Sequence, residues 1–346
     1  MEKHYPRMFP KHCEVRDRGT YKPSCNTIKT TKQRADELEA SLRAAGLYEP
    51  HAGRFWNHPV TRAYHRARFD HAQVLIRSWR RQGIEDALAI YLDLLQLDRG
   101  DHQACRQVVP ALFLRLERDQ ECYDFLKWWQ VHNTTSPASY NWNDTTQRYL
   151  DIKGADATEP ADLWKGEHFL NLPQLVTLHL LKMRLWRTLQ LAQRCRHANP
   201  GFTGEQVVAR IREERHTSED FRGNILEKRP ELAGDNATLD AATERVVESL
   251  EPLLAAMRKT NRFYVTMVMF PDMELFERTG PPKPYTPGSE EEAELAFNYT
   301  YSAWCESPGA IDVLRQVLGA TPDVMDKAMK AAMEKMEKAG SGPRRS

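Results

Sequence analysis

Cysteine is scarce in this sequence, and none of its six cysteines belongs to a CxxC pair. The usual zinc modules and thioredoxin-type redox sites are therefore excluded, because both need closely spaced thiols. His12, Cys13 and Cys25 come nearest to a metal site, but an adjacent pair and one distant thiol form a poor tetrahedral set. We predict reduced thiols, a cytoplasmic or nuclear location, and neither a metal nor another cofactor.

Long apolar runs are also missing. The most apolar window, LVTLHLLKMRLW at 175–186, is interrupted by His, Lys and Arg and falls short of the roughly 20 residues that a membrane span needs. The first residues, EKHYPRMFPKHCEVRDRG, lack both the apolar stretch of a signal peptide and the acid-poor composition of a transit sequence. We expect neither export nor contact with a membrane.

The common catalytic motifs are absent as well. No GxxxxGK[ST] loop, HExxH helix or GxSxG elbow occurs. Phosphate-binding, zinc-peptidase and esterase chemistry therefore have no starting residue. We assign no catalytic residue from motifs and favour a role other than catalysis.

Positive charge is present but unevenly spread. The net charge is +1, yet residues 1–81 contain 17 basic and 8 acidic residues, so the rest of the chain is acidic. Such asymmetry indicates either an anionic partner or an intramolecular match between the two parts. We favour the intramolecular match.

Apolar residues recur every three or four positions over most of the chain, as amphipathic helices require. A first helix is predicted from a Thr31 cap to Gly46, after a partly irregular arm over residues 1–30. A second is predicted over 60–81, ended by Gly83. The remaining predicted helices cover 84–97, 105–116, 118–129, 171–196 (apolar on most sides and therefore central), 204–216, 237–262, 290–306 with a Ser289–Glu292 capping box, 308–319, and a last one from Thr321 before a solvated tail. Residues 263–270 are predicted as a helix continuation or a buried extended segment.

Two of these segments repeat one another. Moving IEDALAIYLDLL (84–95) forward by 34 residues places it on RDQECYDFLKWW (118–129), with Leu88 on Cys122 and Leu95 on Trp129. The same offset places His71 on Cys105. Because 34 residues is the length of a tetratricopeptide (TPR) unit, we predict an all-α fold, a TPR-like helical-repeat array over residues 31–318.

Two stretches interrupt the helical pattern. Residues 131–170 have no period and many turn formers, which predicts a long irregular insertion. Residues 271–289 are rich in Pro and Gly and are predicted to be a loop. Residues 319–346 are expected to add the last helix and the tail.

The insertion and the helix before it supply a candidate interaction groove. Trp128 either packs on the next helix or forms a groove wall for a peptide or ligand, and the packing interpretation is favoured. The groove residues are Tyr123, Lys127, Trp128, Tyr140, Trp142 and Trp164. Asp101, Gln103 and Arg106 lie at the turn into a repeat helix, where Asp101 can cap free amides and Arg106 can reach a carboxylate, so we predict a structural role for this turn.

Several separated motifs occur in order: LDLLQLDRGDHQACRQVVPALFLRLERDQECYDFLKWW, YNWND, YLDIKGAD, LVTLHLLKMRLW, PYTPGSEEEAELAF and SAWCESPGAIDVL. Over roughly residues 50–318 they resemble a group of largely uncharacterised fungal proteins with TPR-like helices, some of which carry a MYND zinc finger. The resemblance implies an α-helical fold and a role in protein contacts. This chain departs from the finger-bearing members, because its end, MDKAMKAAMEKMEKAG, contains no cysteine.

Three functional hypotheses follow. The first is a protein-interaction scaffold with an unidentified protein partner. The second is an enzyme with a pocket between the 131–170 insertion and the 171–196 helix, using Glu167, His168 and His179 as acids and bases. The third is RNA binding through the basic helix at 62–81, where arginines alternate with Tyr and Trp.

Overall fold

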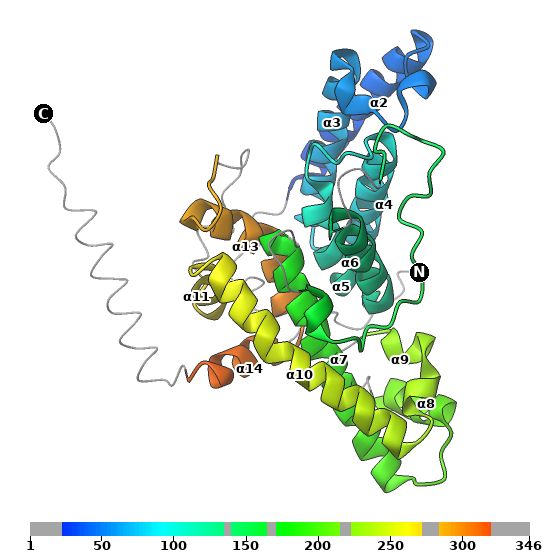
Figure 1. Cartoon of the computed structure of the whole chain (residues 1–346). Coiled ribbons are helices and arrows are strands. Elements are labelled where there is room, and N and C mark those ends of the chain that lie inside the picture. The colour runs from blue at the N-terminus through cyan, green and yellow to red at the C-terminus, as the bar shows by residue number, and fades with distance from the viewer. Residues whose placement is uncertain (1–22, 135–139, 165–170, 215–222, 272–283, 320–346) are drawn as a thin grey trace, which may run out of the picture.

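The computed structural model describes residues 23–134, 140–164, 171–214, 223–271 and 284–319 (Figure 1). Within these ranges the chain is built of helices and contains no β-strand, which confirms the predicted all-α class. None of the helices described is long and apolar enough to cross a membrane.

The amino-terminal half is a stack of consecutive helices, seen at the blue-to-cyan end of Figure 1. Each helix packs on the one that follows it in the chain. An amphipathic helix can bury its apolar face only against such a neighbour. The stack consists of α2 (Cys25–Ala44), α3 (Pro59–Ile76), α4 (Arg81–Leu97), α5 (Val109–Arg115) and α6 (Asp119–Thr134).

The first helix starts earlier than predicted. Ser24 caps α2, because its hydroxyl accepts the backbone N–H of Thr27 at 3.0 Å. The expected cap, Thr31, therefore lies inside the helix, and residues 25–30 are not part of an irregular arm. Gly46, with φ of +67°, follows the end of the helix as predicted.

The second helix ends earlier than predicted. α3 stops at Ile76, and Gly83 lies inside α4 instead of ending α3. A Cβ added at Gly83 would lie 2.9 Å from the carbonyl oxygen of Leu75, so α3 and α4 approach closely where glycine is present.

The 34-residue offset matches the structure for one helix of each pair. It carries α4 onto 115–131, where α6 lies. It carries α3 onto 93–110, but that range holds the end of α4, the turn after it and the short 3₁₀ helix η3 (Cys105–Gln107). α5 begins where the shifted helix would end. The two helix pairs are therefore not copies of one unit in their first helices.

α7 (Leu172–Ala198) is the central helix, as its apolar sequence predicted. Its first half is buried on all sides, and it contacts α5, α6, α8, α10 and α13. The long helices α7 and α10 lie side by side (Figure 1). The other helices of this half are α8 (Gly204–Glu214), α9 (Ile225–Lys228), α10 (Asn236–Thr260), α11 (Tyr264–Met269), α13 (Glu290–Cys305) and α14 (Ala310–Val317).

The structure tests two predictions made for the carboxyl-terminal half. Residues 264–269 form helix α11, so this segment is neither extended nor a continuation of α10. Ser289 caps α13, since its hydroxyl accepts the N–H of Glu292 at 3.3 Å. In a capping box the carboxylate of Glu292 would accept the N–H of Ser289, the cap residue itself. Here it accepts the N–H of the preceding residue, Gly288, at 2.7 Å.

The predicted insertion is irregular where it is described, apart from the short 3₁₀ helix η4 (Ala161–Trp164). It runs along α6 and α7. The described part of the Pro-rich loop, residues 284–289, is also non-helical. Residues 1–22, most of that loop and the helix predicted from Thr321 lie outside the described residues.

Buried ion pairs join the two halves. Arg184 of α7 donates to both carboxylate oxygens of Asp119 of α6 at 2.8 and 2.9 Å, and to the hydroxyl of Ser307 at 3.0 Å. Arg115 of α5 lies 2.8 Å from the carboxylate of Glu306, just after α13. Such bidentate pairs fix relative positions because both partners are forked and planar.

Candidate functional site

The predicted interaction groove is occupied by the insertion. The side chain of Trp128 is completely buried, and its Nε1 donates to Oδ1 of Asp151 at 3.2 Å. Its ring stacks on His132 with centroids 4.0 Å apart, while Tyr140 and Trp142 contact it edge-on at 5.4 and 6.1 Å. A partner can therefore reach this indole only by displacing the insertion.

The other groove residues also face the insertion. Tyr123 donates its hydroxyl to Glu159 Oε1, and Nζ of Lys127 lies 2.8 Å from the same oxygen. Trp164 is buried, with its ring centroid 5.9 Å from that of Tyr123. The structure thus brings the predicted groove residues together, but in the packed contact between α6 and the insertion.

Buried polar groups hold the insertion in place. Lys182 of α7 is fully buried, and its Nζ donates to the carbonyl oxygens of Ala157 at 2.8 Å and Glu159 at 2.6 Å. Burial lowers the pKa of Lys182 to about 7. The buried carboxylate of Asp124 accepts the N–H of Gly154 at 2.9 Å. These contacts explain how an irregular segment keeps a defined path.

One residue of the predicted acid/base set is placed, and it lies in the interior. His179 is 3% exposed and stacks on Trp304, with ring centroids 6.0 Å apart. Burial lowers the pKa of His179 to about 4, so the ring is neutral at pH 7. Glu167 and His168 lie outside the described residues. The geometry around His179 is that of a packed core histidine.

A second set of side chains lies at the surface, around the loop between α2 and α3. Phe55 of this loop is fully buried and anchors it, which leaves the next residue, Trp56, partly exposed on the other side. Gly53 has φ of +88°, and a Cβ there would lie 2.4 Å from Cγ2 of Thr145, so only glycine fits. The N–H of Arg99 donates to the Gly53 carbonyl at 3.1 Å and ties the loop to the turn after α4.

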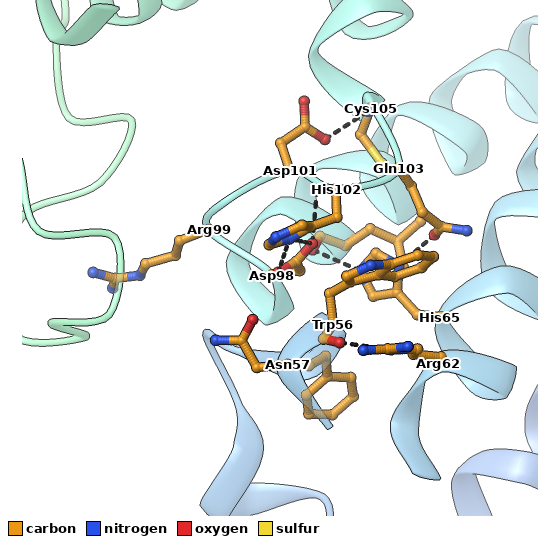
Figure 2. A network of polar contacts seen from close by, with 12 residues as sticks. Trp56, Asn57, Arg62, His65, Asp98, Arg99, Asp101, His102, Gln103 and Cys105 are labelled. Atoms are coloured by element: carbon orange, nitrogen blue, oxygen red, sulfur yellow. Dashed lines mark hydrogen bonds and ion pairs between the residues drawn. The ribbon is translucent and has the colours of Figure 1, made fainter. Parts of the chain in front are cut away.

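That turn carries an aspartate–histidine pair beside the tryptophan (Figure 2). Asp98, which also forms an isolated β-bridge with Arg54, is 2% exposed. Its carboxylate accepts the backbone N–H of His102 at 2.9 Å and lies 3.0 Å from Nδ1 of the same residue. The contact requires a proton on Nδ1, which leaves Nε2 on a side chain that is 44% exposed. The imidazole lies parallel to the Trp56 ring, with centroids 6.0 Å apart and planes 8° apart.

Arginines surround the tryptophan. Nε of Arg62 donates to the Trp56 carbonyl at 2.7 Å, and its guanidinium carbon lies 5.5 Å from the ring centroid. The guanidinium of Arg66, one turn later, lies 5.3 Å from the same centroid. Such cation–π contacts hold guanidinium groups over the ring. We name this set the Trp56 surface, and it consists of Trp56, Arg62, Arg66 and His102.

The arginines of the Trp56 surface differ from the arginine that follows them. Arg68 lies 2.9 Å from Asp93 and 3.9 Å from Glu39, so its charge is matched inside the chain. Arg54, Arg62 and Arg66 form no ion pair within the described part of the chain, although the charge of Arg66 acts on Asp70, one helical turn away. The intramolecular charge match that the sequence favoured therefore includes no ion pair for these three side chains within the described residues.

The predicted structural turn connects the two regions. Asp101 caps η3, because its carboxylate accepts the N–H groups of Cys105 at 2.6 Å and Arg106 at 3.1 Å. Burial raises the pKa of Asp101 to about 7, although Arg106 lies 3.6 Å away. The Arg106 guanidinium carbon lies 4.8 Å from the Trp129 ring centroid on the side of the insertion. Gln103 hydrogen-bonds to His65, beneath the Trp56 surface.

Sequence reasoning missed the centre of this surface. Trp56 and the Asp98–His102 pair were not predicted as site residues, and Arg62 and Arg66 entered only through the RNA hypothesis. One signal was available, since Asp98 and His102 are four residues apart around Gly100 in a polar turn. Of the candidate metal residues, Cys25 is exposed at the start of α2, and His12 and Cys13 lie outside the described residues. Among the described residues, no group of three or more His, Cys, Asp or Glu could hold a metal ion.

Comparison with known proteins adds no relative. No family model, no curated protein and no solved structure matches this chain.

Proposed function

We propose that this protein is an interaction scaffold, a TPR-like helical stack that binds another protein through the Trp56 surface. One observation carries the proposal: two arginines that form no ion pair among the described residues, Arg62 and Arg66, and an oriented histidine surround a partly exposed tryptophan. Tryptophan and arginine are the residues most enriched at the energetic centres of protein interfaces. The resemblance to TPR-like fungal proteins, with its implied role in protein contacts, supports the same function.

The surface is preorganised, which favours binding. Phe55 belongs to a buried cluster with Leu42, Tyr64 and Leu97, so the loop cannot move independently of α2, α3 and α4. Asp98 fixes the ring of His102. A rigid surface loses little conformational entropy when a partner binds, so more of the contact energy appears as affinity.

RNA binding stands second. The basic segment at 62–81 is not one helix, because α3 ends at Ile76. Its aromatic residues are also not displayed together: Tyr64 is fully buried, and Trp79 is contacted by the guanidinium of Arg115 at 5.1 Å. Base stacking needs free aromatic faces along a basic track. The contacts of this segment therefore favour a short protein contact over an extended strand.

The proposal is tested by affinity capture with the purified full-length chain. The variant Arg62→Gln/Arg66→Gln removes two charges from the Trp56 surface. The matched control, Arg258→Gln/Lys259→Gln, removes two charges from exposed positions at the end of α10. We expect specific partners to be lost with the first variant and retained with the control. Partners retained by both variants, or lost equally from both, would count against the proposal.

A further inference from the structure

We infer that the Trp56 surface recognises an acidic segment of its partner, a short stretch of Asp and Glu whose carboxylates bind the guanidinium groups. This inference rests on the proposed function and names the class of partner. It follows from where the unmatched cations lie, which of their donor groups are free, and how far the basic surface extends.

The arginines offer donors in the arrangement that a carboxylate needs. Arg62 uses Nε for the Trp56 carbonyl, and its terminal nitrogens make no hydrogen bond within the described chain. Arg66 is exposed and makes no ion pair there, although Asp70 lies one helical turn away and is attracted to it. A guanidinium donates two parallel N–H groups to one carboxylate, an arrangement stronger than a neutral hydrogen bond. Two neighbouring arginines on one helix face can therefore hold successive acidic side chains.

The histidine completes the surface without adding a competing anion. The carboxylate of Asp98 is buried and accepts two hydrogen bonds from His102, so it is not presented to an incoming ligand. The contact with Nδ1 directs the imidazole so that Nε2 is the nitrogen left for a partner. Figure 2 shows this ring beside Trp56, on the same surface as Arg62.

The limits of the surface favour an acidic peptide over a nucleic acid. Beyond Arg66 the next arginine, Arg68, is already paired with Asp93 and Glu39, so along the described α3 the track of unpaired arginines is short. The Trp56 ring has two guanidinium groups over it and His102 parallel to it. A base that stacked on the indole would therefore compete with side chains already in contact with it, and a strand would find few phosphate contacts. A carboxylate needs neither a free aromatic face nor an extended row of cations.

The inference is tested by fluorescence anisotropy with the full-length chain. The probes are a fluorescein-labelled oligoglutamate peptide and an oligouridylate of equal net charge. We expect the oligoglutamate to bind better, with affinity that falls as salt is added. Arg62→Gln/Arg66→Gln should weaken its binding by about tenfold. Arg66→Gln alone should weaken it by about threefold, and the Arg258→Gln/Lys259→Gln control should leave it unchanged.

The possible results separate the two proposals. Tighter binding of oligouridylate, or oligoglutamate binding that the arginine variants do not weaken, would overturn the acidic-segment inference. If neither probe binds while affinity capture still depends on Arg62 and Arg66, the partner class is wrong and the scaffold function stands. If capture is also independent of them, both proposals fail. Arg66 is exposed and does not hold the Trp56 carbonyl, so Arg66→Gln gives a result even if the double variant misfolds.

Discussion

The two regions on either side of the turn at residues 98–106 differ in the burial and pairing of their polar side chains. On the side of the insertion, Lys182 and Asp124 are buried and each finds partners in the same chain. On the other side, Arg62 and Arg66 are partly or fully exposed and form no ion pair within the described residues, although the charge of Arg66 acts on Asp70. Both regions are rich in aromatic rings and cations, yet only the first is buried from solvent.

The difference follows from solvation, because water can satisfy an exposed polar group but not a buried one. A buried polar group without a partner costs about 1–3 kcal/mol, so a stable fold must match it internally. An exposed guanidinium is solvated and costs the fold almost nothing. Matched polar groups in the interior therefore hold the insertion on α6 and α7, while the charges around Trp56 need no partner within the chain, which is why we propose this surface for binding.

The largest expected effect concerns the buried polar side. Asp119→Ala leaves Arg184 charged and without its bidentate partner in the interior, which should lower the free energy of unfolding by about 3–5 kcal/mol. Glu85→Ala breaks the exposed pair with Arg81 and should cost at most about 1 kcal/mol. Urea denaturation followed by circular dichroism measures both. Equal effects of the two substitutions would show that the buried pair does not join α6 to α7 as described.

The two tryptophans give a direct comparison between the regions. Trp128→Ala should destabilise the protein by about 3–5 kcal/mol, because a fully buried indole leaves a cavity. Trp56→Ala should cost only about 1–2 kcal/mol, since the ring is partly exposed. The order reverses for binding: Trp56→Ala removes the ring that Arg62 and Arg66 contact and weakens oligoglutamate binding, whereas folded Trp128→Ala retains it. Denaturation and anisotropy on the same samples measure the effects on stability and on binding. If the same variant had the larger effect in both measurements, the distinction between a packing region and a binding surface would be contradicted.

The helices could be predicted from the sequence because apolar periodicity is local. Their ends were less certain for a physical reason. Ser24 and Thr31 are both good caps, and choosing between them requires knowing that Ile28 packs against the core. Gly83 looked like a helix end, but the close approach of α3 and α4 uses it inside a helix.

The candidate site was harder to predict because its parts meet only in three dimensions. Trp128 is buried, as the packing interpretation expected, but it packs under the insertion instead of on the next helix. Trp56 and His102 come from separate turns, joined by the bridge between Arg54 and Asp98. No periodic pattern encodes that bridge. The charge asymmetry left an anionic partner and an intramolecular match open and favoured the match, and the structure shows ion pairs for Arg68 but none for Arg62 and Arg66 among the described residues.

A smaller effect is expected from the lysine that holds the insertion. The pKa of Lys182 is lowered from its ordinary value to about 7, so between pH 7 and 10 the unfolded chain binds a proton that the folded chain lacks. Unfolding free energy should therefore rise with pH in this range, by about 2 kcal/mol between pH 7 and pH 9. Lys182→Met removes this contribution. Denaturant titrations of both proteins across the range measure it, and identical pH profiles would mean that the amine is not buried as the structure places it.

The smallest effect is expected at the turn between the regions, and it has the opposite sign. The pKa of Asp101 is raised to about 7 by burial, so between pH 4 and 7 the folded chain holds a proton that the unfolded chain releases. Stability from this group is therefore present at low pH and lost as pH rises, by about 1 kcal/mol between pH 5 and pH 6. Asp101→Asn keeps a side-chain oxygen for the N–H of Cys105 and tolerates the φ of +53° at this position, so the fold should persist. The difference between the two proteins in denaturant titrations should shrink or reverse as pH rises. A difference that stays constant from pH 5 to pH 7 would place the Asp101 carboxyl in contact with solvent instead of under the turn.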